Sequence, residues 1–288
     1  MVPQMTAAAL SPTKAEVPFR LAGGAQPLIL ISVSVNGRGP FDFILDTGAG
    51  TTLLTPTLAE HLKVAITGSK QGHTAGGAVD VKLASVDSIT IGDLSRERID
   101  VAIVDLSQLE GAVGAKIDGD LGHNFFGTLR LTIDYRRNLL RLDDPNRTEY
   151  VGAPPLTNVP ARLAHPAKPL ILVDTQVNGR GPFCFAIDTG TSTTVIADEL
   201  ASELQLKTTE AGNATTGGAA LAVRAARIES LRVGHSQVGE LNVMVGGFLP
   251  ILSSIVGTKL DGVLGYDFLR NYKVVIDYPN SSFSLFAP

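Results

Sequence analysis

The chain is short of several kinds of residue, and each shortage excludes a class of protein. It has one cysteine, Cys184, so no disulfide can form within it. Only 6% of its 288 residues are aromatic, none is tryptophan, and the net charge of -4 includes no basic stretch, which argues against nucleic-acid binding. No apolar run approaches the roughly 18 residues that a membrane-spanning helix needs.

The rest of the composition is that of a packed globular protein. Hydrophobic residues make up 44% of the chain and charged residues 18%, which allows a large core and argues against global disorder. Residues 1–16 are small and polar and lack the apolar stretch of a signal peptide, so we expect a flexible N-terminus there. The five histidines show no metal-ligand spacing, and no metal site is expected.

An internal repeat organises the whole sequence. Residues 17–52 align without a gap on residues 159–194, and 23 of these 36 positions are identical. Weaker matches follow in the same order, including residues 116–122 with 259–265. The repeat predicts two copies of one unit, at residues 17–143 and 159–288, joined by a linker at 144–158 that is rich in Pro, Asn and Thr.

Each unit has the pattern of an all-β structure. Leu28–Val35 and residues 41–45 are apolar runs on either side of Asn36-Gly37, a pair that favours a tight hairpin turn. Further short strands are expected at residues 79–91 and 98–104. Helical patterns are brief, and they occur at residues 56–62, 124–129, 197–204 and 267–272.

In both copies the second of these apolar runs ends in the same tripeptide, Asp46-Thr47-Gly48 and Asp188-Thr189-Gly190. A carboxylate at the end of a buried strand is costly unless it has partners. Glycine permits a turn whose N–H groups point at the carboxylate, and threonine can hydrogen bond across an interface to the equivalent loop. One such tripeptide would be an ordinary turn, but two in a duplication indicate two carboxylates brought together by a pseudo-twofold axis.

These residues resemble a known family. Residues 46–49 and 188–191 resemble the active-site loops of aspartic proteases. Leu121-Gly122 and Leu264-Gly265 resemble the hydrophobic-hydrophobic-Gly element that wraps under the catalytic loop in that fold, and both unit ends resemble bacterial retropepsin-like domains. The resemblance implies two tandem retropepsin-like units fused in one chain, forming a bilobed acid-protease fold of two pseudo-twofold-related β-barrel lobes.

A Gly-Gly pair follows each Asp by about 30 residues, and neither pair has a tyrosine nearby. An ordinary β-turn is one interpretation. The resemblance implies a flap hairpin in each lobe, as in dimeric retroviral enzymes, rather than the single flap of pepsin. The residues expected to contact substrate from these flaps are Ala75, Gly76, Gly77, Thr216, Gly217 and Gly218.

The activity that the resemblance implies is that of an aspartic endopeptidase. Asp46 and Asp188 would share a proton and activate a water, with no metal and no cofactor. The loop residues expected to support them are Thr47, Gly48, Ala49, Thr189, Gly190 and Thr191. The expected partner is a peptide or protein substrate, the expected state a monomer that forms a pseudo-dimer, and the favoured setting bacterial and extracytoplasmic (periplasmic or secreted), with a cytoplasmic one left open.

The two loops differ after the glycine. Thr191 can donate a hydroxyl hydrogen bond to Asp188, whereas Ala49 offers none to Asp46. A donor to the charged form lowers a carboxyl pKa, so we expect Asp188 to ionise more readily and Asp46 to hold the shared proton.

Three other interpretations stay open. The chain could be a catalytically silent peptide-binding module of the same fold, a scaffold protein, or a pair of tandem domains that is active only as an intermolecular dimer. A linker of some 15 residues reaches up to about 50 Å when extended, which permits both side-by-side lobes and exchange with a second chain.

Overall fold

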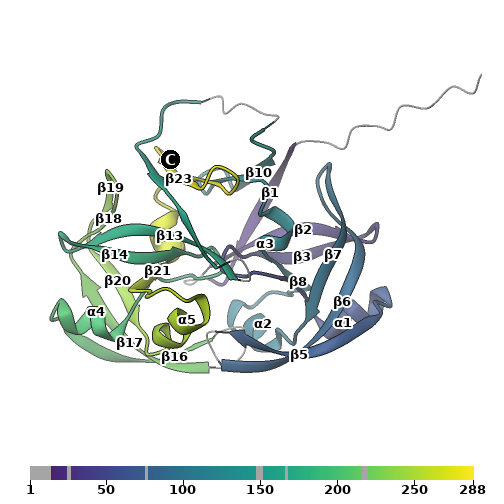
Figure 1. Cartoon of the computed structure of the whole chain (residues 1–288), viewed down its shortest axis with the longest axis horizontal. Helices are drawn as coiled ribbons and strands as arrows, with labels where there is room; N and C mark the ends of the chain where they lie inside the picture. Colours follow the sequence, from purple (N-terminus) through teal and green to yellow (C-terminus); the bar gives the residue numbers. More distant parts are fainter. Residues whose placement is uncertain (1–13, 25–26, 75–76, 147–151, 166–167, 216–219) are drawn as a thin grey trace, which may run out of the picture.

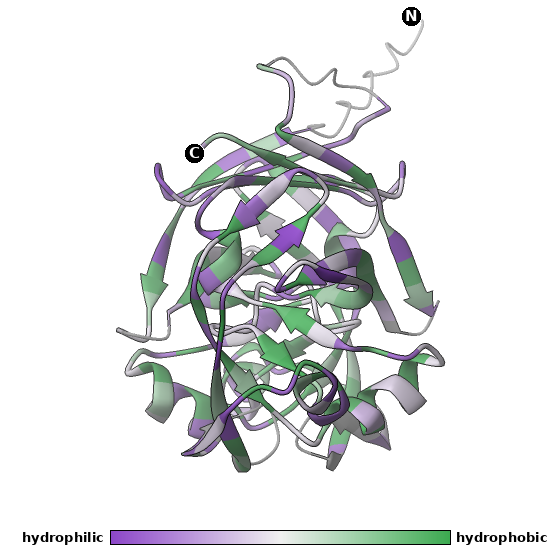
Figure 2. Ribbon diagram, turned by 90° about the vertical axis from the view of Figure 1, so that its left-hand side faces the viewer, coloured by the Kyte–Doolittle hydropathy of each residue, from purple (hydrophilic) through white to green (hydrophobic). Residues whose placement is uncertain are grey.

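The computed structural model describes residues 14–24, 27–74, 77–146, 152–165, 168–215 and 220–288. It has two lobes side by side, joined by a sheet at one end, while the strands β5 and β16 approach each other at the other end (Figure 1). Strands make up most of the described chain, so the all-β, bilobed prediction is confirmed. Apolar and polar residues alternate along many of these strands (Figure 2), as strands with one buried face require.

The two lobes follow the same order of elements, except that β1, β6 and β7 of lobe 1 each correspond to two shorter strands in lobe 2. The elements of lobe 1 are β1 (Lys14–Ala22), β2 (Leu28–Val35), β3 (Arg38–Leu45), β4 (Thr52–Leu54), α1 (Pro56–Leu62), β5 (Ile66–Thr74), β6 (Gly77–Ile91), β7 (Leu94–Ile103), α2 (Ser107–Val113), β8 (Gly119–Leu121), α3 (His123–Phe126), β9 (Arg130–Asp134) and β10 (Leu139–Asp143). Those of lobe 2 are β11 (Thr157–Pro160), β12 (Arg162–His165), β13 (Lys168–Val177), β14 (Arg180–Ile187), β15 (Val195–Ile196), α4 (Asp198–Glu203), β16 (Thr208–Thr215), β17 (Ala220–Ile228), β18 (Leu231–Val233), β19 (Ser236–Val238), β20 (Leu241–Val245), α5 (Leu249–Val256), β21 (Gly262–Leu264), α6 (Tyr266–Leu269), β22 (Lys273–Asp277) and β23 (Ser282–Phe286).

The hairpin predicted at Asn36-Gly37 is confirmed in both lobes. Asn36 and Gly37 have φ angles of 51° and 68°, and Asn178 and Gly179 have 51° and 73°. Asparagine and glycine tolerate this left-handed backbone, which matches the twist of the flanking strands. The Asn36 side chain also accepts a hydrogen bond from the Ser88 N–H at 3.1 Å, which ties the turn to β6.

A strand from late in each unit is inserted beside the strand that ends in aspartate. In lobe 1, β8 pairs parallel with β3 and antiparallel with β4, and in lobe 2, β21 pairs in the same way with β14 and β15. Each inserted strand is followed by a glycine that crosses the Asp-Thr-Gly loop. A Cβ on Gly122 would lie 2.7 Å from the Thr51 carbonyl carbon, and one on Gly265 would lie 2.7 Å from the Thr191 oxygen, so only glycine fits this crossing.

A sheet of six strands joins the lobes, in the order β11-β23-β22-β9-β10-β1. At its centre β9 pairs antiparallel with β22, with Thr132 opposite Val275. Both central strands begin with a cation and end with an aspartate. The antiparallel register therefore places Arg130 opposite Asp277 at one end and Lys273 opposite Asp134 at the other.

Aromatic residues at the end of this sheet pack across the lobe boundary. Tyr135 of lobe 1 contacts Tyr266 of lobe 2, with ring centroids 5.5 Å apart. Tyr278 of lobe 2 contacts His123 of lobe 1 in the equivalent way, at 5.0 Å. The larger hydrophobic core is likewise continuous through both lobes, so the two units fold against each other.

Several boundaries differ from expectation. The strand β1 begins at Lys14, inside the segment expected to be flexible, and β11 begins at Thr157, inside the expected linker. The helices α2 and α5 were not predicted, although α1 has the predicted bounds. No helix in the described part of the chain is long and apolar enough to cross a bilayer.

The cross-lobe ion cluster generates a stability prediction. Arg130 is 6% exposed, pairs with Asp143 and lies 4.0 Å from Asp277 of the other lobe. Arg130→Met would leave the buried Asp277 without this cation and Asp143 with Arg141 alone at 3.0 Å, so we expect the free energy of unfolding to fall by about 3 kcal/mol in chemical denaturation.

The matched control for this substitution is Arg20→Met. It removes the ion pair of Arg20 with Asp42, whose side chains are 49% and 34% exposed, and should cost less than about 1 kcal/mol. Equal losses in the two variants would contradict a structural role for the buried cluster.

Candidate active site

Each Asp-Thr-Gly aspartate lies where its strand ends and the inserted strand runs alongside. The Asp46 N–H donates to the Leu121 carbonyl at 3.2 Å, and the Asp188 N–H donates to the Leu264 carbonyl at 3.1 Å. The preceding residues are fully buried, which anchors the loops in the core. Asp46 and Asp188 themselves are partly exposed, so solvent reaches both residues.

The loops direct hydrogen-bond donors at the two carboxylates. The Gly48 and Ala49 N–H groups donate to Asp46 Oδ1 at 2.6 and 3.1 Å. The Gly190 N–H donates to Asp188 Oδ1 at 2.8 Å. These contacts fix the orientation of each carboxyl group before any ligand is present.

The two threonines link the loops reciprocally. Thr47 Oγ1 accepts the N–H of Thr189 at 3.1 Å, and Thr189 Oγ1 accepts the N–H of Thr47 at 3.1 Å. Each hydroxyl also donates across the boundary, from Thr47 to the Ile187 carbonyl at 3.1 Å and from Thr189 to the Leu45 carbonyl at 2.6 Å. Both side chains are buried, so the four bonds are made out of contact with water.

The glycines allow the two aspartates to come together. A Cβ on Gly48 would lie 2.7 Å from Asp188 Cγ, and one on Gly190 would lie 2.5 Å from Asp46 Cγ. Each carboxyl group therefore rests against the glycine of the opposite loop, where no other residue has room. The carboxyl groups of Asp46 and Asp188 are also close enough to hydrogen bond with each other.

The comparison with known families agrees with this arrangement. A family model described as Aspartyl protease matches the chain twice, over residues 31–125 and 173–268. The chain belongs to the aspartyl protease family. One match lies in each lobe, so the predicted pair of tandem retropepsin-like units is confirmed. No curated protein matches the chain.

Burial makes both carboxyl groups of this aspartyl protease family member weak acids. The pKa of Asp46 rises from the ordinary 3.8 to about 8. Burial is the main cause, and the charge of the neighbouring Asp120 is the second. Burial and then Asp46 raise the pKa of Asp188 well above its ordinary value. The pair therefore retains protons in a pH range where exposed aspartates have lost theirs.

The hydrogen bond from Thr191 is only one of several influences on the pKa of Asp188. The Thr191 hydroxyl donates to Asp188 Oδ2 at 2.8 Å, as expected, and this bond lowers the pKa of Asp188. Burial and the Asp46 charge outweigh it, however, so the pKa of Asp188 is raised rather than lowered. Because the pKa is raised for both aspartates, the order in which they ionise stays a prediction.

Sequence reasoning missed Asp120. It lies on β8, is 7% exposed, and is within hydrogen-bond contact of Asp46. The available signal was a mismatch in the repeat, because the equivalent residue in lobe 2 is Val263. Among the described residues, no three His, Cys, Asp or Glu side chains are grouped so that they could hold a metal ion.

A second layer of hydrogen bonds holds the loops in place. The buried Thr52 donates its hydroxyl to Asn124 Oδ1 at 2.8 Å, and Thr194 donates to Asp267 Oδ1 at 2.6 Å. Each threonine oxygen also accepts an N–H from the inserted segment, that of Gly122 in lobe 1 at 3.2 Å. Asn124 and Asp267 were not among the predicted site residues.

The described residues include only part of the predicted flaps. Strands β5 and β6 form a hairpin that is paired up to Thr74 and Gly77, and β16 and β17 form its counterpart, paired up to Thr215 and Ala220. Gly77 is the first residue of β6. The other predicted flap residues, Ala75, Gly76, Thr216, Gly217 and Gly218, lie outside the described residues.

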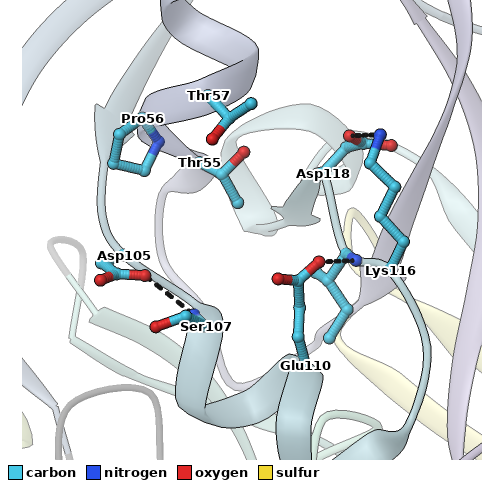
Figure 3. Close-up of a pocket in the computed structure, with 9 residues that line it drawn as sticks. Thr55, Pro56, Thr57, Asp105, Ser107, Glu110, Lys116 and Asp118 are labelled. Atoms are coloured by element: carbon cyan, nitrogen blue, oxygen red, sulfur yellow. Dashed lines mark hydrogen bonds and ion pairs between the residues drawn. The ribbon is translucent and has the colours of Figure 1, made fainter.

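A pocket of about 420 Å³ in lobe 1 lies apart from the two aspartates (Figure 3). Asp105, Glu110 and Asp118 line it. Asp105 accepts the Ser107 N–H at 2.9 Å, Glu110 accepts the Ile117 N–H at 2.8 Å, and Asp118 pairs with Lys116 at 2.6 Å. These carboxylates hold the wall of the pocket together, and the dyad does not line it.

The reciprocal threonine bonds can be tested by Thr189→Val. This nearly isosteric change removes the acceptor for the buried Thr47 N–H and the donor to the Leu45 carbonyl. Two buried groups lose their partners at about 1–3 kcal/mol each, so chemical denaturation should show a loss of about 2–6 kcal/mol. Thr67→Val removes an exposed hydroxyl bond to Leu83, and a comparable loss there would contradict the assignment.

The raised pKa of Asp46 predicts a pH-dependent stability. The folded state keeps a proton that the unfolded state releases near pH 4, so this contribution to wild-type stability is lost as the pH rises toward 8. The unfolding free energy of Asp46→Asn should therefore increase relative to wild type between pH 4 and 8 in urea titrations.

The control for this titration is Asp105→Asn. A Ser107 N–H lowers the pKa of the exposed Asp105 below its ordinary 3.8, so its contribution is lost only at lower pH and the stability of Asp105→Asn relative to wild type should stay level between pH 4 and 8. The same trend in both variants would show that the effect does not come from burial of Asp46.

Proposed function

We propose that the protein is an aspartic endopeptidase in which Asp46 and Asp188 hydrolyse peptide bonds by general acid–base catalysis. The observation that carries the proposal is the contact of the two carboxyl groups, each resting on the glycine of the opposite loop. Their partial exposure would give a water and a substrate carbonyl access.

The proposed chemistry follows from one shared proton. Two carboxyl groups in contact cannot both ionise readily, so the pair holds a single proton over its working range. The ionised partner takes a proton from a water molecule, whose oxygen attacks the peptide carbonyl carbon. The protonated partner hydrogen bonds the carbonyl oxygen and stabilises the tetrahedral gem-diol, and a proton then passes to the leaving amine.

The remaining loop residues would hold the two carboxyl groups in position. Thr47 and Thr189 hold the loops at a fixed separation, while the N–H groups of Gly48 and Gly190 hold one oxygen of each carboxyl group in place. The hairpins β5–β6 and β16–β17 would cover the substrate from opposite sides, one from each lobe.

We infer that one chain is sufficient for activity. Both loops of a single chain bond to each other, and β9 of lobe 1 pairs with β22 of lobe 2 within the same chain. These contacts favour the monomer over tandem domains that depend on a second chain. An extracytoplasmic location belongs to the same proposal and rests on the family resemblance alone.

The activity is tested by dyad substitutions. Asp46→Asn and Asp188→Asn should each lower the turnover of a fluorogenic peptide library, scanned from pH 3 to 8, by about 10²- to 10⁴-fold because the shared proton is lost. Pepstatin should inhibit the wild-type protein. Asp105→Asn, which alters an exposed carboxylate of the same lobe, should retain cleavage.

A binding module would behave differently. If the wild-type protein bound pepstatin but turned over no library peptide, the silent-module interpretation would replace the enzyme. Turnover that survived in an Asp46→Asn/Asp188→Asn double variant would exclude this dyad.

A further inference from the structure

A third carboxyl group, that of Asp120, lies beside the dyad in lobe 1 only. Its strand β8 is enclosed by β3 and β4, where Ile44 and Leu53 are its paired neighbours. The residue is 7% exposed, and its Oδ1 atom has no hydrogen-bond partner. A buried carboxyl group with an unpaired oxygen is unfavourable for folding, so a role other than packing is indicated.

The groups that act electrostatically on Asp120 are carboxyls. Asp46, at the end of β3, is in hydrogen-bond contact with it, and Asp188 approaches from lobe 2. The His123 ring follows on α3, and burial lowers its pKa below the ordinary 6.5, which favours the neutral ring at pH 7. Strand β4 has no titratable side chain.

The other charged residues near this strand are engaged elsewhere. Asp118, two residues earlier, accepts the Asp42 N–H at 3.0 Å and pairs with Lys116 at 2.6 Å. The Asp42 carboxylate pairs with Arg20 at 2.9 Å. These ion pairs are satisfied among themselves, which leaves Asp120 to share protons with the dyad.

Lobe 2 shows that the fold has no need of a carboxyl at this position. Val263 occupies the equivalent place on β21, is 4% exposed, and pairs with Ala186 and Val195 in the same register. A valine therefore fills the site in one lobe, whereas the other lobe has an acid of similar size directed at Asp46. The difference between the lobes concerns charge and not shape.

We propose that Asp120 is a positioning residue that acts through Asp46, keeping a proton in the carboxyl cluster up to neutral pH and so extending the working range of the dyad upward. This inference rests on the proposed function of Asp46 and Asp188.

The direction of the effect follows from like charges. Burial is the main cause that raises the pKa of Asp46 to about 8 and that of Asp120 to about 7, and an ionised Asp120 adds to the first shift by disfavouring ionisation of Asp46. A dyad that has lost both protons cannot protonate the carbonyl oxygen, so the alkaline limb of the rate profile reports this proton. Removing the Asp120 charge must move that limb to lower pH.

The test uses Asp120→Asn, which keeps the shape and removes the charge, and Asp120→Val, which installs the residue of lobe 2. We expect the alkaline limb of kcat/KM, measured on a cleaved library peptide from pH 3 to 9, to move down by about one pH unit or more in both variants. Val263→Ala changes packing at the equivalent place and should leave the limb where it is. An unmoved limb in Asp120→Asn would overturn the proposal.

A second measurement is independent of turnover and of the Val variant's folding. Carboxyl ¹³C NMR titration of aspartate-labelled protein should show Asp46 titrating at lower pH in Asp120→Asn than in wild type. If wild-type protein cleaves no peptide, the proposed function fails, and this titration alone decides the coupling. If Asp120→Asn loses activity at every pH while the Asp46 titration is unchanged, Asp120 has only a structural role.

Discussion

Thr47 and Thr189 each accept the other's backbone N–H and donate to a carbonyl of the opposite lobe, and the geometry of the site depends on this reciprocal bonding. A hydroxyl has one donor hydrogen, so both loops must be in register for all four bonds to form. Because the bonds are buried, a rotation of one lobe would leave polar groups unsatisfied. The central pair of strands, β9 and β22, sets the lobes at the separation that these bonds need.

The close approach of the two loops also brings acidic side chains together, which is electrostatically unfavourable. The loops hold Asp46 and Asp188 together, and Asp120 is added from one side, so three acidic groups share a poorly solvated volume. Buried like charges disfavour ionisation, and the protein holds protons there instead. If the proposed function holds, this destabilising arrangement is what supplies both an acid and a base to one substrate carbonyl. The two lobes are therefore similar enough to pair their loops about a pseudo-twofold axis, but they differ in charge because only lobe 1 contributes Asp120.

The parts of the fold that follow local rules could be predicted from the sequence. Asn36-Gly37 predicted the hairpin, and the helical pattern at residues 56–62 predicted α1, because turn and helix preferences act over a few residues. The helices α2 and α5 were missed. Both begin without a side-chain cap hydrogen bond, whereas Thr55 caps the equally short α1, so tertiary contacts determine them.

The sequence by itself determined the duplication, the two Asp-Thr-Gly loops and the family, since these are patterns of residues along the chain. Only the tertiary structure decided that Asp120 belongs with Asp46. The two are brought together because β8 is inserted between β3 and β4, a long-range pairing that spacing does not reveal. The substitution of Asp120 for the valine of lobe 2 was visible as a mismatch, but its meaning depends on which side chain lies across the sheet.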